Sequence, residues 1–356
     1  MPDMTSRHAS LPLSLLDRAN TIEGFTEAEV LKKVIARARR SEELGYSRFW
    51  VAEHHGVPGI AGSAPTLLMS AIAGATDRIR VGSGGVMLPN HQPLVVAEQT
   101  ATLQALHPGR IDLGLGRSVG FTPAVRAALR RDKEAAQQFP EDLAELLGFL
   151  GGTGPFTARP QDHAVTPVFI LATGQGLRWA AEAGLAVVVG GPSLFQRSGQ
   201  AGHEGLARYR RDFRPSPWFA EPYVIVSVNL AVADTREAAR DLVLPEAWAL
   251  AQSRVKGEFR ALEPITDIRA RLRGESDAGP VTDRDRRRVE ENLASGIYGT
   301  PEEMHAAVSS LVDFTGADEL LVTGGMSDPA GQRRSDELVA GLFAGEGGHP
   351  SSGHGA

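Results

Sequence analysis

SRFWVAEHHGVPGIAG occupies residues 47–62 of this 356-residue chain. Its first half is an apolar, β-type run that ends in Glu53, His54 and His55, and its second half is a loop rich in glycine and proline. A strand that continues directly into three titratable side chains is either an ordinary polar strand end or the rim of an active site. The pattern of the other strands decides between these two interpretations.

The same strand-then-helix unit recurs along the chain. Apolar β-type runs lie at 11–17, 46–53, 78–88, 110–117, 166–173, 185–190, 223–233 and 317–324. Helical patterns follow them at 27–44, 65–75, 93–106, 123–150, 177–183, 194–212, from 235–242 onward and at 335–343. Such units in order predict parallel strands with right-handed crossovers, and several runs are apolar throughout, as in strands buried on both faces. We therefore predict an α/β fold, a TIM (β/α)8 barrel rather than an open doubly wound sheet.

One connection is much longer than the others. Residues 245–300, between the seventh and eighth strands, hold far more chain than one helix needs. Within this insertion, 271–290 is charged and contains glycine and proline, which predicts a mobile segment. It is interpreted either as a lid over the barrel mouth or as a disordered surface insertion. We predict a single barrel domain over 1–344 that includes this insertion, and a disordered tail over 345–356.

Composition excludes several functional classes. The chain has no cysteine, which excludes disulfides, thiolate zinc sites, iron–sulfur clusters and a cysteine nucleophile. Its net charge is −6, and no basic stripe with interleaved aromatics is present, so no nucleic-acid partner is expected. The first residues lack the apolar core of a signal peptide, and no run of about eighteen apolar residues occurs. We expect a cytoplasmic protein without a membrane partner.

In the predicted barrel, Glu53, His54 and His55 lie at the carboxyl end of the second strand. Catalytic groups of TIM barrels lie at the carboxyl ends of the strands, so these residues should meet the residues that follow the third, fourth and fifth strands. Neighbouring side chains on a strand point to opposite faces, so one histidine is expected to be the acid/base group and the other an orienting group. Adjacent histidines diverge, and no third ligand stands nearby in the sequence, so no metal is expected.

Three further motifs favour a bound cofactor. Gly84-Gly85 lies inside a predicted strand, RVGSGGVMLPNHQP (80–93), which indicates a barrel bend or the close approach of a ligand such as a flat aromatic cofactor. Arg117 in HPGRIDLGLGRSVG (107–120) suits a phosphate or another anion. The loop ATGQGL (172–177) joins a strand to a helix N-terminus, a place that holds phosphate, although it matches neither GxGxxG nor a P-loop.

In this order and spacing, FWVAEHHGVPGIAGSAP (49–65), RIRVGSGGVMLPNHQPLVVAEQ (78–99) and LHPGRIDLGLGR (106–117) resemble the bacterial luciferase-like flavin monooxygenases. The similarity is closest to the single-chain bacterial branch, some members of which act in antibiotic biosynthesis. The resemblance implies a barrel that binds reduced FMN (FMNH2), supplied by a separate NAD(P)H:flavin reductase. It further implies that oxygen adds to the flavin C4a carbon, and that the resulting peroxide oxidises a small organic or polyketide-type substrate. The resemblance implies a homodimer and does not imply a metal.

The resemblance also implies roles for individual residues. His54 matches the family's acid/base histidine, and we expect His55 and Glu53 to orient it. Gly84-Gly85 matches the site of an unusual non-prolyl cis peptide under the flavin ring. Further cofactor contacts are implied at Arg117, Val119, Gly120, Thr173, Gly174 and Gly176. As walls of a substrate pocket, or alternatively as core residues, we single out Met87, Phe121 and Trp179, while His91 and the 271–290 segment are expected to shape that pocket.

The chain departs from the family pattern in two places. The loop 172–177 lacks the family's serine, so an F420-dependent oxidoreductase on the same fold stays an alternative. Gly116 stands where luciferase has a cysteine, so light emission is not predicted. A non-catalytic flavin-binding protein is a second alternative, which the Glu-His-His stretch disfavours. A metal-dependent hydrolase is a third, disfavoured by the absence of ligands.

Overall fold

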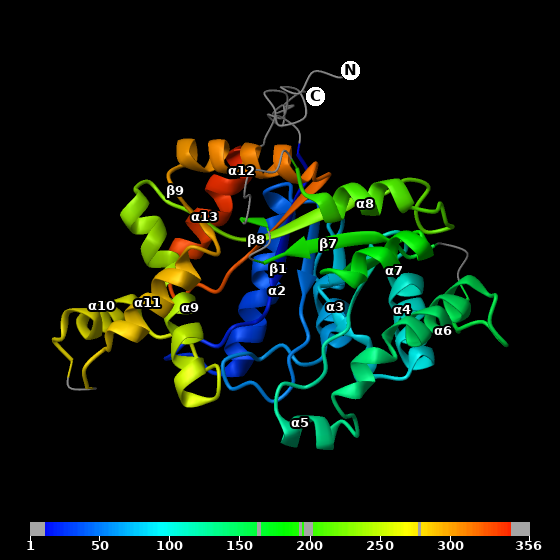
Figure 1. The fold of residues 1–356 in the computed structure, drawn as a ribbon, viewed down its shortest axis with the longest axis horizontal. Coiled ribbons are helices and arrows are strands. Elements are labelled where there is room, and N and C mark those ends of the chain that lie inside the picture. Colours follow the sequence, from blue (N-terminus) through cyan, green and yellow to red (C-terminus); the bar gives the residue numbers. More distant parts are fainter. Residues whose placement is uncertain (1–10, 162–164, 192–193, 196–201, 277–278, 343–356) are drawn as a thin grey trace, which may run out of the picture.

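Eight parallel strands close into a barrel at the centre of the molecule (Figure 1). The computed structural model describes residues 11–161, 165–191, 194–195, 202–276 and 279–342. Around the barrel, the strands follow one another as β1 (Leu13–Asp17), β2 (Arg48–Val51), β3 (Arg80–Ser83), β5 (Ile111–Gly116), β6 (Val168–Leu171), β7 (Ala186–Gly190), β8 (Val224–Val232) and β10 (Glu319–Thr323). Because β10 pairs in parallel with both β1 and β8, these eight strands form a closed barrel, and the predicted TIM barrel is confirmed.

Most strand residues are apolar because both faces of the strands are buried. On β1, Leu15 packs outward into the layer between strands and helices, whereas Leu16 points into the barrel. Phe49 and Trp50 on β2 alternate in the same way. This alternation with period two gives two cores, an outer one shared with the helices and a smaller inner one that fills the barrel.

Helices cover the outside of the barrel. They are α2 (Glu27–Glu43), α3 (Pro65–Ala73), α4 (Pro93–Leu106), α6 (Phe139–Gly151), α7 (Gln175–Ala183), α8 (Glu204–Asp212), α12 (Pro301–Thr315) and α13 (Pro329–Leu342). Local signals set their ends: Thr26 and Glu29 form a capping box on α2, and Gly184 and Gly316 end α7 and α12 in the left-handed conformation. Among the described residues, no helix is both long and apolar enough to cross a membrane.

Two predicted elements are interrupted. The third run divides at Gly84-Gly85, whose peptide bond is cis as the resemblance implies, into β3 and the short β4 (Val86–Met87), followed by a 3-10 turn at Leu88–Asn90. The helical pattern at 123–150 divides into α5 (Pro123–Ala128), a 3-10 turn at Glu134–Gln137 and α6. A new helix begins there because Pro140 occupies the first turn of α6, the part of a helix that tolerates proline.

The long insertion after β8 is a packed helical layer. It contains α9 (Arg236–Lys256), α10 (Ile265–Arg273), α11 (Asp283–Leu293) and the short β9 (Ile297–Gly299), and Figure 1 shows the three helices together on one side of the barrel. Val289 and Leu293 of α11 are buried against Leu244 and Trp248 of α9. The expectation of a disordered segment at 271–290 is therefore wrong for its described residues, while the tail at 345–356 lies outside them.

Candidate active site

A small cavity opens at the carboxyl end of the barrel. We call it the mouth cavity; its volume is 210 Å³, and its lining residues include Leu16, Trp50, Gly84, Thr173 and Ser227. Apart from two hydroxyl groups, the wall is apolar. A Cβ at Gly84 would stand 2.6 Å from Leu16 Cδ1, so only glycine leaves this side of the cavity open. The structure thus brings Gly84 and Thr173 together at one cavity, as expected.

A second cavity lies beside the loops that follow β1, β2 and β5. This rim cavity has a volume of 320 Å³ and is lined by residues that include Arg18, His54, His55, Phe121 and Phe259. Its outer wall comes from the end of α9 and the loop after it. The insertion therefore lines the rim cavity with residues in 250–259, and the expectation that 271–290 shapes the substrate pocket stays a prediction.

Glu53 is the centre of a hydrogen-bond network behind the rim cavity. Its buried carboxylate accepts hydrogen bonds from the Met87 amide (3.0 Å) and the Asn90 side-chain amide (3.3 Å). The Nε2 atoms of His55 and His91 lie 2.7 and 3.0 Å from its oxygens. Burial alone would raise the pKa of Glu53, but the hydrogen bonds from His55, His91 and Met87 outweigh it and lower this pKa to about 2.

The two neighbouring histidines have different environments. The hydrogen bond to Glu53 raises the pKa of His55 above its usual value. His54 points the other way, stacks on Phe121 with 5.9 Å between ring centroids, and has a buried Nδ1 without a partner among the described residues. Burial, and next the positive charge of Arg18, lower the pKa of His54 to about 4. His55 and Glu53 thus bind each other, and neither reaches His54 Nδ1, contrary to the expected orienting role.

The structure also supplies the third potential metal ligand that seemed absent from the sequence. One ligand atom each of Glu53, His55 and His91 lies within 4.8 Å of the others, so the expectation that no third ligand stands nearby is wrong. Both histidines already direct Nε2 at the carboxylate. A metal at this place would have to replace these hydrogen bonds, so the described geometry is that of a proton-holding network.

The glycine loop after β6 and Arg117 form a possible anion site. α7 starts directly after Gly174, which has no side chain to cap the first amides of the helix. The exposed guanidinium of Arg117 lies over the Trp179 ring of the same helix, 5.8 Å from its centroid. Arg117 thus contacts the helix whose uncapped N-terminus offers free amides, and a guanidinium and such amides are both groups that hold a phosphate.

Several predicted residues play structural parts instead. Trp179 packs on Phe139 (ring centroids 5.8 Å apart) and supports Arg117, so it does not line the described cavities. The Met87 side chain lies against Gly116, and His91 belongs to the Glu53 network. Gly120 packs against α5, where a Cβ would meet Val125 Cγ1 at 2.7 Å.

Of the remaining predicted cofactor contacts, Gly85 packs against the backbone of Gly114, Val119 is half-buried, and Gly176 follows Gly174 in the first turn of α7. None of the three lines the mouth cavity or the rim cavity.

Arg18 is the residue that the sequence reasoning missed. It follows β1, pairs with the buried Glu246 of α9, and lines the rim cavity beside His54. The signal was present, because Arg18 stands at a carboxyl strand end just as Glu53 does. The strand ends of β2 to β6 were considered, and that of β1 was not.

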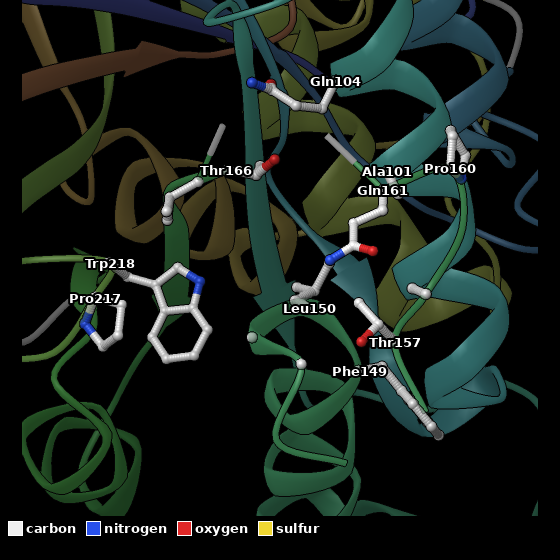
Figure 2. A pocket seen from close by; sticks show the side chains of 14 residues that line it. Ala101, Gln104, Phe149, Leu150, Thr157, Pro160, Gln161, Thr166, Pro217 and Trp218 are labelled. Atoms are coloured by element: carbon white, nitrogen blue, oxygen red, sulfur yellow. The ribbon is translucent and has the colours of Figure 1, made fainter. Parts of the chain in front are cut away.

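A third hollow, of 270 Å³, lies at the opposite end of the barrel (Figure 2). Trp218 stands on one side of it, and Thr157 and Gln161 stand on the other. Thr166 and Trp218 precede β6 and β8, which places the hollow at the amino ends of the strands. Its described lining contains no titratable side chain, so it offers no acid/base chemistry.

Comparison with known proteins agrees with this architecture. The sequence model of luciferase-like monooxygenases matches residues 15–319. The chain is 37% identical over 345 residues to the uncharacterized protein YvbT of Bacillus subtilis (strain 168), which covers 93% of this chain and 96% of YvbT. It is 43% identical over 167 residues to the N-acetyl-S-alkylcysteine monooxygenase of the same bacterium, covering 45% of this chain and 50% of that protein.

Solved structures share the fold over nearly the whole chain. The crystal structure of apo-MsnO8 matches with a TM-score of 0.79 and 31% identity, covering 94% of this chain and 98% of that one. The oxygenating constituent of 3,6-diketocamphane monooxygenase from Pseudomonas putida, in complex with FMN, matches with a TM-score of 0.65 and 18% identity over 95% and 99% of the chains. An F420-dependent secondary alcohol dehydrogenase with an F420–acetone adduct matches with a TM-score of 0.60 and 14% identity over 94% and 99%. The last two likenesses concern the fold alone.

Proposed function

Because this chain belongs to the luciferase-like monooxygenase family, we propose that it oxidises a small organic substrate with reduced FMN and molecular oxygen. When bound, reduced FMN supplies two electrons, so that one atom of O2 enters the substrate and the other leaves as water. The observation that carries the proposal is the mouth cavity. It is mainly apolar, has Gly84 on one side, and lies at the carboxyl end of the barrel, where TIM barrels carry their catalytic groups.

The residues at the mouth fit a flavin. A flat aromatic ring needs a cavity without a projecting side chain against its face, and Gly84 provides this on one side. The phosphate of FMN needs positive charge and free amides, which Arg117 and the start of α7 provide. FMN is therefore held, in this proposal, by Gly84, Thr173, Gly174 and Arg117.

His54 is the proposed acid/base group. Its imidazole is neutral at pH 7, because burial and Arg18 lower its pKa to about 4. A neutral imidazole can accept a proton at the unpartnered Nδ1 and return it. Glu53 and His55 keep the neighbouring backbone in place through their network, and Phe121 and the end of α9 form part of the wall of the rim cavity beside His54.

Flavin titrations test the phosphate site first. Replacing Arg117 by methionine should weaken FMN binding about tenfold, because a charge-assisted contact is lost, and leave riboflavin binding unchanged, since riboflavin has no phosphate. Arg178→Met is the matched control. Arg178 is an exposed arginine of α7, the helix that Arg117 contacts, and it forms a surface ion pair with Glu182. Equal losses for FMN and riboflavin would remove Arg117 from the phosphate site.

Rapid mixing with oxygen tests the chemistry. Protein with bound FMNH2, mixed with aerated buffer, should return the oxidised-flavin absorbance at a rate different from that of free FMNH2, and His54→Asn should change that rate. Return at the free rate in both proteins would contradict the proposal. Tight flavin binding without any change in oxygen reactivity would favour a non-catalytic flavin protein, and binding of F420 in place of FMN would favour hydride transfer.

Two partners belong to the proposal. A separate NAD(P)H:flavin reductase supplies FMNH2, and the chain forms a homodimer. Turnover with an added reductase and NAD(P)H, but not with NAD(P)H alone, would support the first. The mass in solution, measured by light scattering, decides the second.

A further inference from the structure

Arg18 lines the rim cavity and is paired with the carboxylate of Glu246. Its side chain keeps 22% of its surface exposed, whereas its partner Glu246 keeps 4%. One oxygen of Glu246 pairs with Nη2 of Arg18, and the other accepts the N–H of Gly325 at 2.8 Å. Because both oxygens are engaged, Glu246 fixes the guanidinium in one orientation.

Among the residues that the structure describes, no second acceptor bonds to the guanidinium. Nε is shielded from water and has no hydrogen-bond partner among the described residues. A guanidinium carries five N–H groups in a planar fork that matches a carboxylate, and Glu246 engages only Nη2. Arg18 lines the rim cavity and keeps part of its side chain exposed, so the N–H groups that Glu246 does not engage are donors on which a ligand oxygen can bind.

The remainder of the rim cavity is mainly apolar. Phe121, Leu250 and Phe259 form walls beside Arg18, and His54 stands between Arg18 and the Phe121 ring. The acid that lines the cavity, Glu258, is paired with Arg260. The cavity thus presents one fixed cation at one end and apolar surface along its length, which suits a ligand with one acidic end and an apolar body.

We propose that the rim cavity binds an organic acid, with its carboxylate on Arg18 and its apolar part between Phe121 and Phe259. The ligand's body then lies beside His54. The inference rests on the proposed function only where it treats this acid as the substrate, because binding itself requires neither flavin nor oxygen.

Binding of matched probes to the flavin-free protein tests the site. Hexanoate and 3-phenylpropanoate are compared with hexanamide and 3-phenylpropanamide by calorimetry or saturation-transfer NMR. The wild-type protein should bind at least one acid about tenfold or more tightly than its amide, because only the acid gains a charge-assisted pair. If neither acid binds more tightly than its amide, the proposal is wrong.

Variants separate recognition from folding. Arg18→Met alone would leave Glu246 buried without a partner, so the double variant Arg18→Met/Glu246→Gln removes both charges. In the double variant, the acid and amide affinities should become equal. Glu246→Gln alone should keep or increase the preference for the acid, because Arg18 loses its competing carboxylate. Arg254→Met, an exposed change on α9, should alter neither affinity.

Three results would overturn the proposal: a preference for the acid that persists in the double variant, a preference that Glu246→Gln removes, or a double variant that loses FMN affinity instead. The last would assign Arg18 to the cofactor's phosphate. A failure of FMN to bind the wild-type protein would contradict the proposed function while leaving the acid site measurable.

Discussion

His54 and His55 are neighbours in the chain, yet their surroundings shift their pKa values in opposite directions. Burial and the positive Arg18 lower the pKa of His54, whereas the hydrogen bond to Glu53 raises that of His55. Both residues lie in the loop after the strand that ends at Val51, where His55 meets the Glu53 carboxylate and His54 stacks on Phe121. Only one of the pair therefore faces Phe121 as a neutral imidazole at pH 7.

This difference predicts how stability depends on pH. His54 has a usual pKa of 6.5 and a pKa of about 4 in the folded protein. Between these values the unfolded chain binds more protons than the folded chain, so the contribution of His54 lowers stability as the pH falls from 6.5 toward 4. Between about pH 7.5 and about pH 5, His54 should account for roughly 2 kcal/mol of lost unfolding free energy.

Urea unfolding at the two pH values measures this term. His54→Asn stays neutral, so its unfolding free energy should fall less than that of the wild-type protein. His55→Asn is the contrasting variant, because a raised pKa contributes stability that is present below pH 6.5 and is lost as the pH rises. Equal losses on acidification in the wild-type protein and His54→Asn would contradict the assigned environment of His54.

Sequence reasoning reached this site only in part, for physical reasons. The strand-end rule placed Glu53, His54, Gly84 and Thr173 at one end of the barrel, because parallel strands share a direction. It could not show which of the two neighbouring histidines binds Glu53. It also could not show that His91, which is distant in the sequence, reaches the same carboxylate from the next loop. Nor could it show that Glu246 reaches across from the insertion to Arg18.

At the scale of elements, α9 determines how the insertion meets the site. Proline in a helix interior usually ends or kinks the helix, so an end near Pro245 would be expected. The helix nevertheless continues to Lys256, because its buried face packs on α10 and α11. Backbone hydrogen bonds from Gly59 N–H to Phe259 oxygen (2.9 Å) and from Leu262 N–H to Thr21 oxygen (2.8 Å) then join the following loop to the loops after β1 and β2. The charged 271–290 segment resembled a mobile loop because its apolar positions are few, although Val289 is buried.

The insertion should therefore depend on its own small core. Leu244→Ala removes a side chain that is 1% exposed, and it should lower the unfolding free energy by about 2–5 kcal/mol through the lost contacts and the cavity left behind. Val255→Ala changes a residue of the same helix that is 61% exposed and should have an effect within about 0.5 kcal/mol.

Urea unfolding and limited proteolysis of residues 257–300 provide the measurement. Faster cleavage in Leu244→Ala alone would confirm that this core holds the insertion in place. Unchanged cleavage and stability in both variants would show that the insertion does not depend on Leu244.

At the scale of the whole molecule, the two ends of the barrel have different roles. Near the amino ends of the strands, buried Asp112 of β5 accepts hydrogen bonds from Arg48 of β2 (2.8 Å) and Arg80 of β3 (2.9 Å). The Glu319 carboxylate of β10 accepts hydrogen bonds from the Arg48 guanidinium and from the hydroxyl of Tyr223, the residue before β8. These charges join strands that are distant in the sequence. The sequence displays them only as polar residues where apolar runs begin, so the network could not be predicted.

If the amino ends supply stability and the carboxyl ends supply chemistry, one substitution should affect the first without the second. Asp112→Ala removes a fully buried carboxylate and leaves two half-buried arginines short of a partner, so it should lower the unfolding free energy by about 3 kcal/mol. Glu182→Ala, which breaks the exposed pair with Arg178, should change it by at most about 1 kcal/mol. The folded Asp112→Ala protein should bind the carboxylate probes within about twofold of the wild-type affinity, because no residue that lines the rim cavity bonds to Asp112, whereas Trp50 of the mouth cavity loses its acceptor there. A variant that keeps its stability but loses ligand affinity would reverse this assignment, since it would mean that the ionic network positions the catalytic strand ends rather than holding the barrel closed.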